Sequence, residues 1–520
     1  MIFRAPEADL AIPDVPLTPF LLERAVRRGD KAAFIDGPTG RVLTYAGWAE
    51  AVRGAASGFA ARGLKKGDVV AIYSPNVPEY AIAFHAVSLI GGVVTTLNPL
   101  NTPGEVALQL RDCNALYLVT IGPCVEKALQ AARETTVREL FVFGDAEGAT
   151  PFNALLAAGA NLPSVSIDPR EDLVALPYSS GTTGLPKGVM LTHRNLVANI
   201  LQASAVLEQS EQDTVLGVLP FFHIYGMTVI MNLGLYRGVT IVTMPRFDLE
   251  QCLGLCEKYG VTFANVVPPI VLAFAKHPLV DRFDLSRLRI VFSGAAPLSE
   301  AVAAAASARL GCRVVQGYGL TETSPVTHGA RLDGAQTTLA SIGPPVPNTE
   351  SKVVDVTTGA ELEPGQQGEI CIRGPQVMKG YLNRPDATRE MIDGDGWLHT
   401  GDIGYADEDG CFFVVDRLKE LIKYKGLQIA PAELEATLLA HPAVADAAVI
   451  PIPDEEAGEV PKAFVVLRSD VPTDQIMSFV AERVAPYKRL RVIEAIDQIP
   501  KSPSGKILRR MLVERERAGA

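Results

Sequence analysis

Apolar runs of strand length alternate with stretches of helical spacing along most of the chain. One such stretch spans residues 44–62, where apolar side chains recur on one helical face, at Trp48, Val52, Ala55, Ala56 and Phe59. A strand is expected at residues 69–74, a helix at 77–90 and a second strand at 92–97. Because this alternation is typical of parallel sheets covered by helices, we predict an α/β fold.

The two ends of this pattern differ from its middle. Residues 1–45 are expected to form an irregular arm with one helix at 20–28. From Gly343 onward, short apolar strands are separated by Gly/Pro turns, at residues 352–356, 369–373 and 412–415. This pattern of short strands and turns predicts a small, mostly β region.

The charge balance shifts at Asp416. Residues 417–520 carry 16 Lys/Arg and 15 Asp/Glu, whereas the rest of the chain carries 32 and 44. We therefore place a domain boundary there. Residues 1–416 are expected to form a large N-terminal domain of αβ-layered sheets plus the small β region, and residues 417–520 a small, mobile α+β C-terminal domain.

Composition excludes several classes of protein. The 520 residues carry a net charge of −11, which argues against nucleic acid as a partner. The seven cysteines form no C-x-x-C pair, so neither a disulfide framework nor a zinc site is expected, and a reducing, cytoplasmic location is predicted. No apolar run reaches the roughly 18–20 residues of a membrane span. A monomer and a homodimer both remain open.

Residues 178–189 read Tyr-Ser-Ser-Gly-Thr-Thr-Gly-Leu-Pro-Lys-Gly-Val and form the most distinctive stretch of the chain. Two glycines permit a tight turn, and Lys187 adds a mobile charge; together with hydroxyls they suit the many acceptor oxygens of a polyphosphate. The residues expected to contact phosphate are Ser179, Ser180, Gly181, Thr182, Thr183, Gly184 and Lys187. The stretch is not a standard P-loop, because Val189 occupies the position expected of a magnesium-binding hydroxyl.

Further polar residues stand in Gly-flanked turns. Thr321 and Glu322 offer hard oxygen ligands suited to Mg²⁺, and Asp402 offers a carboxylate that can accept ribose hydroxyls. Each is also explained, taken alone, as a solvated or locally satisfied turn residue. Arg417 follows the domain boundary, and Lys506 lies in a basic Pro/Gly-jointed tail. The alternative interpretation of both residues is that they are solvated side chains on the surface.

Taken in order, these motifs resemble the adenylate-forming superfamily of acyl-CoA synthetases, luciferases and peptide-synthetase adenylation domains. The matching stretches cover nearly the whole chain and lie at residues 178–189, 220–226, 317–322, 397–405, 416–435 and 500–506. Residues 368–374, Gly-Glu-Ile-Cys-Ile-Arg-Gly, resemble the second signature box of 4-coumarate–CoA ligases. This box is also explained as a structural strand that marks relatives without touching substrate.

The resemblance implies a first half-reaction in which a carboxylate attacks the α-phosphate of Mg·ATP to give an acyl-adenylate and pyrophosphate. It implies that Lys506 contacts the carboxylate and α-phosphate, that Thr321 holds phosphate and that Glu322 positions Mg²⁺. His223 is expected near the acyl carbonyl, the alternative being a packed core imidazole. The remaining nucleotide site implied by the match is Ala295, Ala296, Pro297, Gln316, Gly317, Tyr318, Gly319, Asp402 and Arg417.

The resemblance also implies a second half-reaction, in which coenzyme A takes the acyl group. The small domain is expected to rotate about a hinge at Asp416 and Lys419, withdrawing Lys506 and bringing in another face. That face carries Lys423 and Gln428, assigned by the match to the nucleotide, and Lys425 and Gly426, assigned to coenzyme A.

The sequence says less about which carboxylic acid is the substrate. The match implies an acyl pocket of small and apolar residues, at Tyr225, Phe292, Gly294, Gly317, Gly319, Pro325 and Val326. Residues 221–223 lack the aspartate of amino-acid-activating relatives, and plant 4-coumarate ligases often carry lysine where Phe292 stands. The preferred expectation is an acid–CoA ligase for a 4-coumarate- or cinnamate-like aryl acid.

Other functions share the same motifs. The alternatives are a medium- or long-chain fatty acid–CoA ligase, an acyl-AMP ligase that loads a carrier protein, and a luciferase-like oxygenase. A non-catalytic binding relative is disfavoured, because Lys187, Glu322, Asp402, Arg417 and Lys506 are all present.

Overall fold

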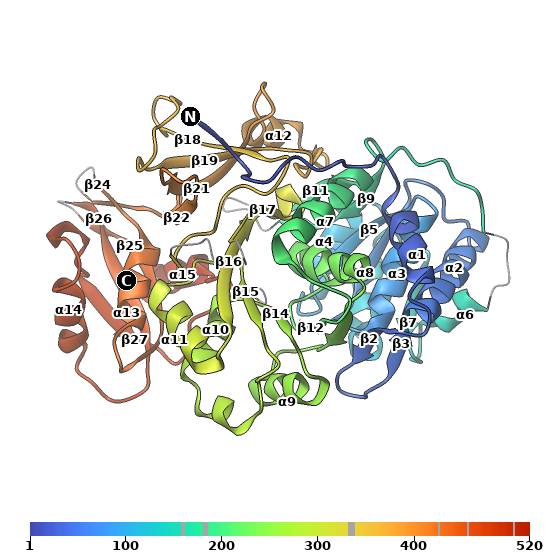
Figure 1. Cartoon of the computed structure of the whole chain (residues 1–520), viewed down its shortest axis with the longest axis horizontal. Coiled ribbons are helices and arrows are strands. Elements are labelled where there is room, and N and C mark those ends of the chain that lie inside the picture. The colour runs from blue at the N-terminus through green and yellow to red at the C-terminus, as the bar shows by residue number, and fades with distance from the viewer. Residues whose placement is uncertain are drawn as a thin grey trace.

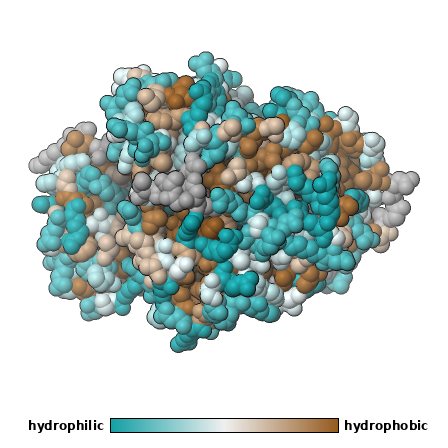
Figure 2. Space-filling model, in the orientation of Figure 1, coloured by the Kyte–Doolittle hydropathy of each residue, from teal (hydrophilic) through white to brown (hydrophobic). Residues whose placement is uncertain are grey.

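The computed structural model describes residues 1–157, 162–179, 186–330, 338–424, 427–454, 457–502 and 505–519. The predicted fold class is confirmed: a large α/β N-terminal domain lies beside a small C-terminal domain (Figure 1). Within the described residues, no helix combines the length and the apolar character needed to cross a membrane. The face seen in Figure 2 mixes hydrophilic and hydrophobic residues, with hydrophilic ones over much of it.

The first layered sheet has the strand order β10-β11-β9-β5-β4-β6-β7-β8, with β20 added beside β11. Its central strands pair in parallel, as the alternation of elements predicts. Every residue of β5 is buried, because helices cover both faces of the sheet. The strands are β4 (Val69–Tyr73), β5 (Val93–Leu97), β6 (Ala115–Ile121), β7 (Glu139–Phe143), β8 (Thr150–Pro151), β9 (Leu173–Leu176), β10 (Tyr178–Ser179), β11 (Lys187–Thr192) and β20 (Gly380–Tyr381).

The second layered sheet has the order β17-β16-β15-β14-β12-β13-β2-β3. Its strands are β2 (Ala32–Asp36), β3 (Val42–Thr44), β12 (Thr214–Gly217), β13 (Thr240–Thr243), β14 (Phe263–Val266), β15 (Ile290–Ser293), β16 (Arg313–Gly319) and β17 (Val326–Gly329). The expected irregular arm at residues 1–45 is wrong in part. Residues 32–44 form a hairpin whose first strand pairs with β13, a contact across some 200 residues that local patterning does not reveal.

Helices pack around and between the two sheets. Thr44 caps α2 by accepting a hydrogen bond from Gly47 N, so the predicted helix begins at Tyr45. The large domain contains α1 (Leu17–Val26), α2 (Tyr45–Ala61), α3 (Pro78–Leu89), α4 (Pro103–Asp112), α5 (Val125–Ala132), α6 (Asn153–Leu156), α7 (His193–Leu207), α8 (Leu233–Arg237), α9 (Leu249–Tyr259), α10 (Pro268–Lys276), α11 (Glu300–Leu310) and α12 (Pro385–Met391), with the short helices η2 (Gly226–Asn232) and η4 (Thr321–Thr323).

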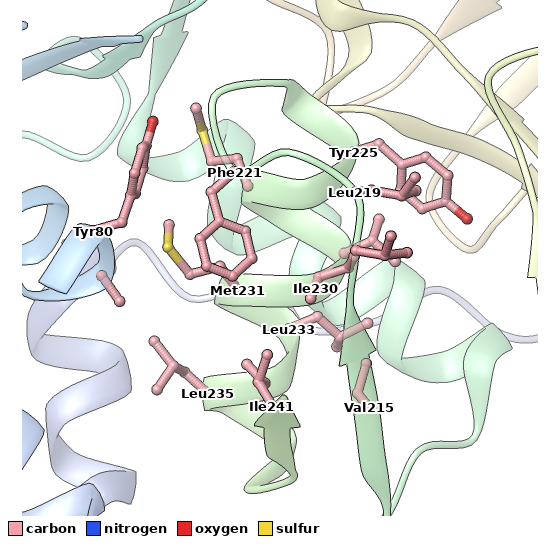
Figure 3. Packing of buried hydrophobic residues seen from close by; sticks show 14 of the residues in the cluster. Tyr80, Val215, Leu219, Phe221, Tyr225, Ile230, Met231, Leu233, Leu235 and Ile241 are labelled. Carbon is pink, nitrogen blue, oxygen red and sulfur yellow. The ribbon is translucent and has the colours of Figure 1, made fainter. Parts of the chain in front are cut away.

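The largest core cluster joins residues of both layered sheets through the helices between them. Tyr80 of α3 and Phe221 pack ring against ring at 5.8 Å (Figure 3). Met231 of η2 belongs to the same cluster and is fully buried (Figure 3). This shared core fixes the segment at residues 220–226 against both sheets.

The small β region is an antiparallel sheet of order β1-β18-β19-β21-β22. Its strands are β1 (Ile2–Arg4), β18 (Glu350–Val354), β19 (Gly368–Arg373), β21 (Leu398–Ala406) and β22 (Phe412–Arg417). The chain's first strand therefore lies beside β18 (Figure 1). The signature box forms β19, where Ile370 and Ile372 are fully buried.

The C-terminal domain contains a second small sheet of order β24-β23-β26-β25, with β27 added beside β26. Its elements are β23 (Ile422–Tyr424), β24 (Leu427–Ile429), α13 (Pro431–Leu439), β25 (Val444–Asp454), β26 (Gly458–Leu467), α14 (Thr473–Ala481), β27 (Val492–Ala495) and α15 (Arg509–Gly519). The basic tail thus ends in a helix, α15, that residue patterning did not predict.

Candidate active site

Asp402 and Arg417, predicted from separate motifs, lie opposite each other on the paired strands β21 and β22. Arg417 Nε is 3.3 Å from Asp402 Oδ1. The hydroxyl of Tyr318 donates a hydrogen bond of 2.5 Å to Asp402 Oδ2. Burial raises the pKa of the Asp402 carboxyl, and the Arg417 guanidinium opposes that rise. The structure therefore brings together an aromatic ring, a buried carboxylate and a cation.

Lys506 reaches the same place from the C-terminal domain. Burial, together with the charge of Arg417, lowers the pKa of its amine to about 8, while the charges of Glu420 and Asp402 oppose the change. Gly505 packs closely against the large domain, since a Cβ there would lie 2.9 Å from Val267 Cγ2. Gly505 also has φ near +77°, so two independent constraints favour glycine immediately before the lysine.

His223 lies in the segment between β12 and η2, which is fixed by two hydrogen bonds. Asn76 Oδ1 accepts from Phe221 N at 2.7 Å, and His223 Nδ1 accepts from Tyr225 N at 3.3 Å. Burial, together with the nearby charge of Lys506, lowers the pKa of His223 to about 4. The imidazole is therefore neutral near pH 7, with its proton on Nε2.

Glu322 and Lys187 meet at a residue that the motifs did not single out, Tyr381. The Tyr381 hydroxyl donates a 2.8 Å hydrogen bond to Glu322 Oε1, and Glu322 is buried. Lys187 Nζ lies 4.9 Å from the centroid of the Tyr381 ring. Pairing of β11 with β20, which sets Val189 opposite Tyr381, creates this arrangement. Thr321 stands beside Glu322 in η4.

Part of the predicted site falls outside the described residues. These are Ser180, Gly181, Thr182, Thr183 and Gly184 of the phosphate loop, with Lys425 and Gly426. Ser179 is described and lies opposite Lys187 in the β10–β11 pair. Gln428 lies on β24, opposite Lys423 of β23.

Lys423 is exposed on β23. Its backbone N–H donates to Glu459 Oε2 at 2.7 Å. Among the described residues, no hydrogen bond or ion pair joins Lys423 to Lys506 or Asp402. The structure thus presents Lys506, and not the Lys423 strand, to the large domain.

The predicted adenine slot is built around Gln316 on β16. Gln316 Oε1 accepts from Leu298 N at 3.1 Å, and its Nε2 donates to Leu298 O at 3.0 Å. These bonds hold the turn at Ala295, Ala296 and Pro297 beside the end of β16. Ala295 is exposed and adopts a left-handed φ of 71°. Gln316, the turn and Tyr318 therefore share one end of the sheet.

The predicted acyl-pocket residues pack against one another. The Tyr225 hydroxyl donates to Phe292 O at 3.1 Å, and the two rings meet edge to face at 6.4 Å. A Cβ on Gly294 would lie 3.0 Å from Tyr225 Cε1, and one on Gly317 would lie 2.2 Å from Phe292 Cζ. These glycines are therefore needed to accommodate the two rings.

The remaining pocket residues follow on the next strand. A Cβ on Gly319 would lie 2.0 Å from Pro325 O, which precedes Val326 at the start of β17. All seven predicted pocket residues thus belong to one cluster of segments around β15, β16 and β17.

The predicted hinge begins at a buried carboxylate. Asp416 Oδ1 accepts from Arg417 N at 2.7 Å, and Oδ2 accepts from Ala432 N at 2.8 Å in the first turn of α13. Burial raises the Asp416 pKa, which the charge of Arg509 opposes. Lys419 follows on the surface. Asp416 therefore links the last strand of the large domain to the small one.

The signature box contributes a polar cluster of its own. Glu369 Oε2 lies 2.9 Å from His399 Nδ1, and Cys371 Sγ lies 3.5 Å from the same atom. The hydrogen bonds to Cys371 and Glu369 raise the pKa of His399 to about 10. These contacts join β19 to β21, which supports the interpretation of the box as a structural strand.

Comparisons with known proteins agree with this geometry. The model of the AMP-binding enzyme family matches residues 21–382, and that of the AMP-binding enzyme C-terminal domain matches residues 433–506. The chain is 48% identical over 530 residues to 4-coumarate–CoA ligase 5 of Oryza sativa subsp. japonica, covering 100% of this chain and 98% of the relative. It is 45% identical over 531 residues to 4-coumarate–CoA ligase 1 of Petroselinum crispum, covering 100% and 97%.

Solved structures give the same assignment. An anthranilate CoA ligase in complex with anthranoyl-AMP superposes with a TM-score of 0.90 at 26% identity, covering 98% of each chain. A benzoate CoA ligase from Burkholderia xenovorans superposes with a TM-score of 0.87 at 26% identity, covering 96% of this chain and 99% of that one. The chain therefore belongs to the AMP-binding enzyme family and is an AMP-forming acid–CoA ligase of the 4-coumarate–CoA ligase-like group.

Proposed function

We propose that this ligase activates a 4-coumarate- or cinnamate-like aryl acid. The observation that carries the proposal is the cluster of Tyr225 and Phe292 with Gly294 and Gly317. Two aromatic side chains spaced by glycines offer flat apolar surfaces of the kind that suits a planar ring. The names of the similar proteins, 4-coumarate–CoA ligases and aryl-acid CoA ligases, favour the same class.

In the first step the acid's carboxylate attacks the α-phosphate of ATP, so that pyrophosphate leaves with the electrons of the broken P–O bond. Two anions must approach each other, and a positive charge between them lowers the barrier. Lys506 is proposed to supply that charge, since it lies half-buried among Arg417, Asp402 and His223. Neutral His223 is proposed to orient the acyl carbonyl.

The nucleotide is proposed to lie between the two ends of this site. Asp402 and Arg417 hold the ribose, Tyr318 and Gln316 line the adenine slot, and the phosphate loop with Lys187 and Thr321 holds the phosphates. The Asp402 carboxylate is already buried and oriented by Tyr318, so it accepts ribose hydroxyls without reorganisation. Ala295, Ala296, Pro297, Gly317 and Gly319 provide backbone beside the base.

Glu322 fits the Mg²⁺ ion that ATP carries. Its carboxylate is a hard oxygen donor, buried and oriented by Tyr381, close to Lys187 of the phosphate loop. Bound there, Mg²⁺ supplies neutralisation of phosphate charge. Tyr381 is a positioning residue that keeps Glu322 from turning away.

In the second step the thiol of coenzyme A attacks the acyl-adenylate, and AMP leaves. Lys506 and the approaching thiol need the same side of the acyl carbonyl, so we propose that the C-terminal domain turns about Asp416 and Lys419. The turn withdraws Lys506 and presents the strand pair that carries Lys423 and Gln428, with Lys425 and Gly426 nearest coenzyme A.

Thioester formation against a panel of acids tests the proposal. AMP and acyl-CoA are measured with ATP, Mg²⁺ and coenzyme A for cinnamate, 4-coumarate, benzoate, phenylacetate, octanoate and palmitate. We expect the phenylpropenoic acids to give the highest kcat/KM. Faster turnover of octanoate or palmitate overturns the aryl assignment in favour of a fatty acid ligase, and AMP without free thioester indicates transfer to a carrier protein.

A further inference from the structure

The polar cluster of the small β region, Glu369, Cys371 and His399, brings together three side chains that bind transition metals. One ligand atom of each, a carboxylate oxygen, the thiol sulfur and a ring nitrogen, lies within 4.8 Å of the other two. Cys371 Sγ is 3.5 Å and Glu369 Oε2 is 2.9 Å from His399 Nδ1. Thiolate, imidazole and carboxylate are the ligand types of protein zinc sites. The cluster therefore has the donor set of a zinc site.

Strand pairing, rather than sequence spacing, assembles this cluster. Glu369 and Cys371 are two residues apart on β19, so their side chains point to the same face of the sheet. Ile370 and Ile372, which alternate with them, belong to the apolar core of the small sheet. His399 of β21 lies directly opposite Cys371. Because the ligands come from two strands, the cluster lacks the C-x-x-C spacing by which a zinc site is usually found in a sequence.

The separations suit a tetrahedral Zn²⁺ ion. With bonds of about 2.3 Å to sulfur and about 2.0 Å to nitrogen, a tetrahedral angle puts these two ligand atoms about 3.5 Å apart. The distance of 3.5 Å between Cys371 Sγ and His399 Nδ1 agrees with this value. The Glu369 oxygen, 2.9 Å from Nδ1, has to move out by about 0.5 Å, which a small rotation of the side chain provides.

Outer contacts orient the ligands as they do in known zinc sites. His399 Nε2 lies 3.5 Å from Asp393 Oδ2, so a carboxylate stands behind the imidazole when Nδ1 binds the metal. Asp393 is itself fixed, because its Oδ1 accepts two backbone hydrogen bonds of 2.9 Å within its own turn. Glu369 Oε1 accepts from Gly401 N at 2.9 Å, which leaves Oε2 for the ion.

Access and charge also suit a divalent cation. The side chains of His399 and Glu369 are 33% and 14% exposed, so an ion reaches them from solvent, whereas Cys371 is fully buried. A thiolate and a carboxylate carry two negative charges that Zn²⁺ neutralises, and the ion replaces the protons of the thiol and the imidazole. Lys352, opposite Cys371 on β18, lies 3.3 Å from Glu361, whose carboxylate offsets its charge.

From these observations we infer that Glu369, Cys371 and His399 bind one Zn²⁺ ion that ties β19 to β21. Three protein ligands leave the fourth position to water. The site differs in chemistry from Glu322, whose oxygen alone suits the harder Mg²⁺ ion. The inference goes beyond the proposed function and does not depend on which acid the enzyme activates.

The test measures metal binding by the full-length protein with a phosphine reductant that keeps its thiols reduced. The Zn²⁺ content is measured by mass spectrometry after equilibrium dialysis with excess Mg²⁺, which occupies sites made of carboxylates alone. The affinity for Zn²⁺ is measured by competition with a chromophoric chelator. We expect one Zn²⁺ per chain. Co²⁺ in its place is expected to give a thiolate-to-metal charge-transfer band and the visible bands of a tetrahedral ion.

Variants assign the ion to the cluster. Cys371→Ala is expected to lose the ion and the charge-transfer band. The matched control is Cys411→Ala, the same substitution between β21 and β22 of the same small β region, and it is expected to bind as the wild type does. Asp393→Asn, which changes the carboxylate behind His399, is expected to weaken binding about tenfold. If Cys371→Ala does not fold, Glu369→Gln, which keeps the shape of the side chain but removes its charge, gives the same comparison.

A thermal melt gives an independent measurement. Zn²⁺ is expected to raise the Tm of the wild type and of Cys411→Ala, but not that of Cys371→Ala, because only a bound ion stabilises the folded state. The inference is overturned by a wild type without stoichiometric Zn²⁺, by binding without a thiolate band, or by equal binding in Cys371→Ala and the wild type. Loss of the ion in Cys411→Ala also overturns it, since the cluster then does not hold the ion by itself. Loss confined to the variants of the cluster supports it.

Discussion

The buried position of Lys506 predicts that acid activation weakens in mild alkali. Burial, together with the charge of Arg417, lowers the pKa of this lysine from 10.5 to about 8. A lowered lysine pKa means that the amine is charged below pH 8 and neutral above it. At pH 9 about one molecule in eleven keeps the charge, so kcat/KM for adenylation is expected to fall about tenfold relative to pH 7. A lysine with an ordinary pKa would hold the rate almost constant over this range.

The assay is ATP–pyrophosphate exchange from pH 6 to pH 10, because it reports the first half-reaction without the titrating thiol of coenzyme A. Cinnamate is the acid of choice, since a phenol such as that of 4-coumarate titrates near pH 10. The kcat/KM profile reports groups of the free enzyme. His223, with a pKa of about 4, stays neutral throughout the range.

The Lys506→Arg variant is the matched control. A guanidinium keeps its charge at every pH of the assay, so its profile is expected to be flat above pH 8, at a lower rate because its shape differs from that of an ammonium. A wild-type profile that stays level to pH 9.5, or a Lys506→Arg profile that still declines near pH 8, refutes the assignment of this decline to Lys506.

Two further changes probe the supports of the site. Tyr381→Phe removes the hydrogen bond to Glu322 Oε1. We expect the variant to need about tenfold more Mg²⁺ for half-maximal adenylation, which corresponds to about 1.4 kcal/mol of binding free energy. An unchanged Mg²⁺ titration contradicts the positioning role. Arg509 forms two ion pairs, with Nη2 2.7 Å from Glu435 Oε1 and Nη1 2.6 Å from Glu420 Oε2. Arg509→Met leaves a buried carboxylate without its ion-pair partner. The free energy of unfolding of the C-terminal domain, measured in a denaturant melt, is expected to fall by about 3–5 kcal/mol. Arg510→Met is the control, because this side chain is 85% exposed, and it is expected to change the free energy of unfolding by less than about 0.5 kcal/mol. Equal effects of the two variants would show that the ion pairs of Arg509 contribute nothing to stability.

The spacing of apolar residues predicts those helices and strands that are determined by neighbouring residues in the sequence. The parallel strands around β4 and β5 and the start of α2 at Thr44 follow from apolar spacing and capping alone. The meeting of Asp402 with Arg417 was predicted only through a family resemblance, because strand pairing, not sequence spacing, brings them together. The β2–β3 hairpin escaped prediction for the same reason, since its first strand pairs with β13.

One site residue could not be found from motifs. Tyr381 lies in a stretch without a recognisable pattern, and its relation to Glu322 exists only through the pairing of β20 with β11. Because that pairing joins segments far apart in the sequence, local spacing gives no sign of it.

The strand β14 also helps to position Lys506. It ends at Val266, and Val267, the next residue, packs against Gly505, which immediately precedes Lys506. A rigid strand sets such a position more reproducibly than a loop. The place where Lys506 enters the large domain is therefore set by the same sheet that carries Phe292 and Gln316.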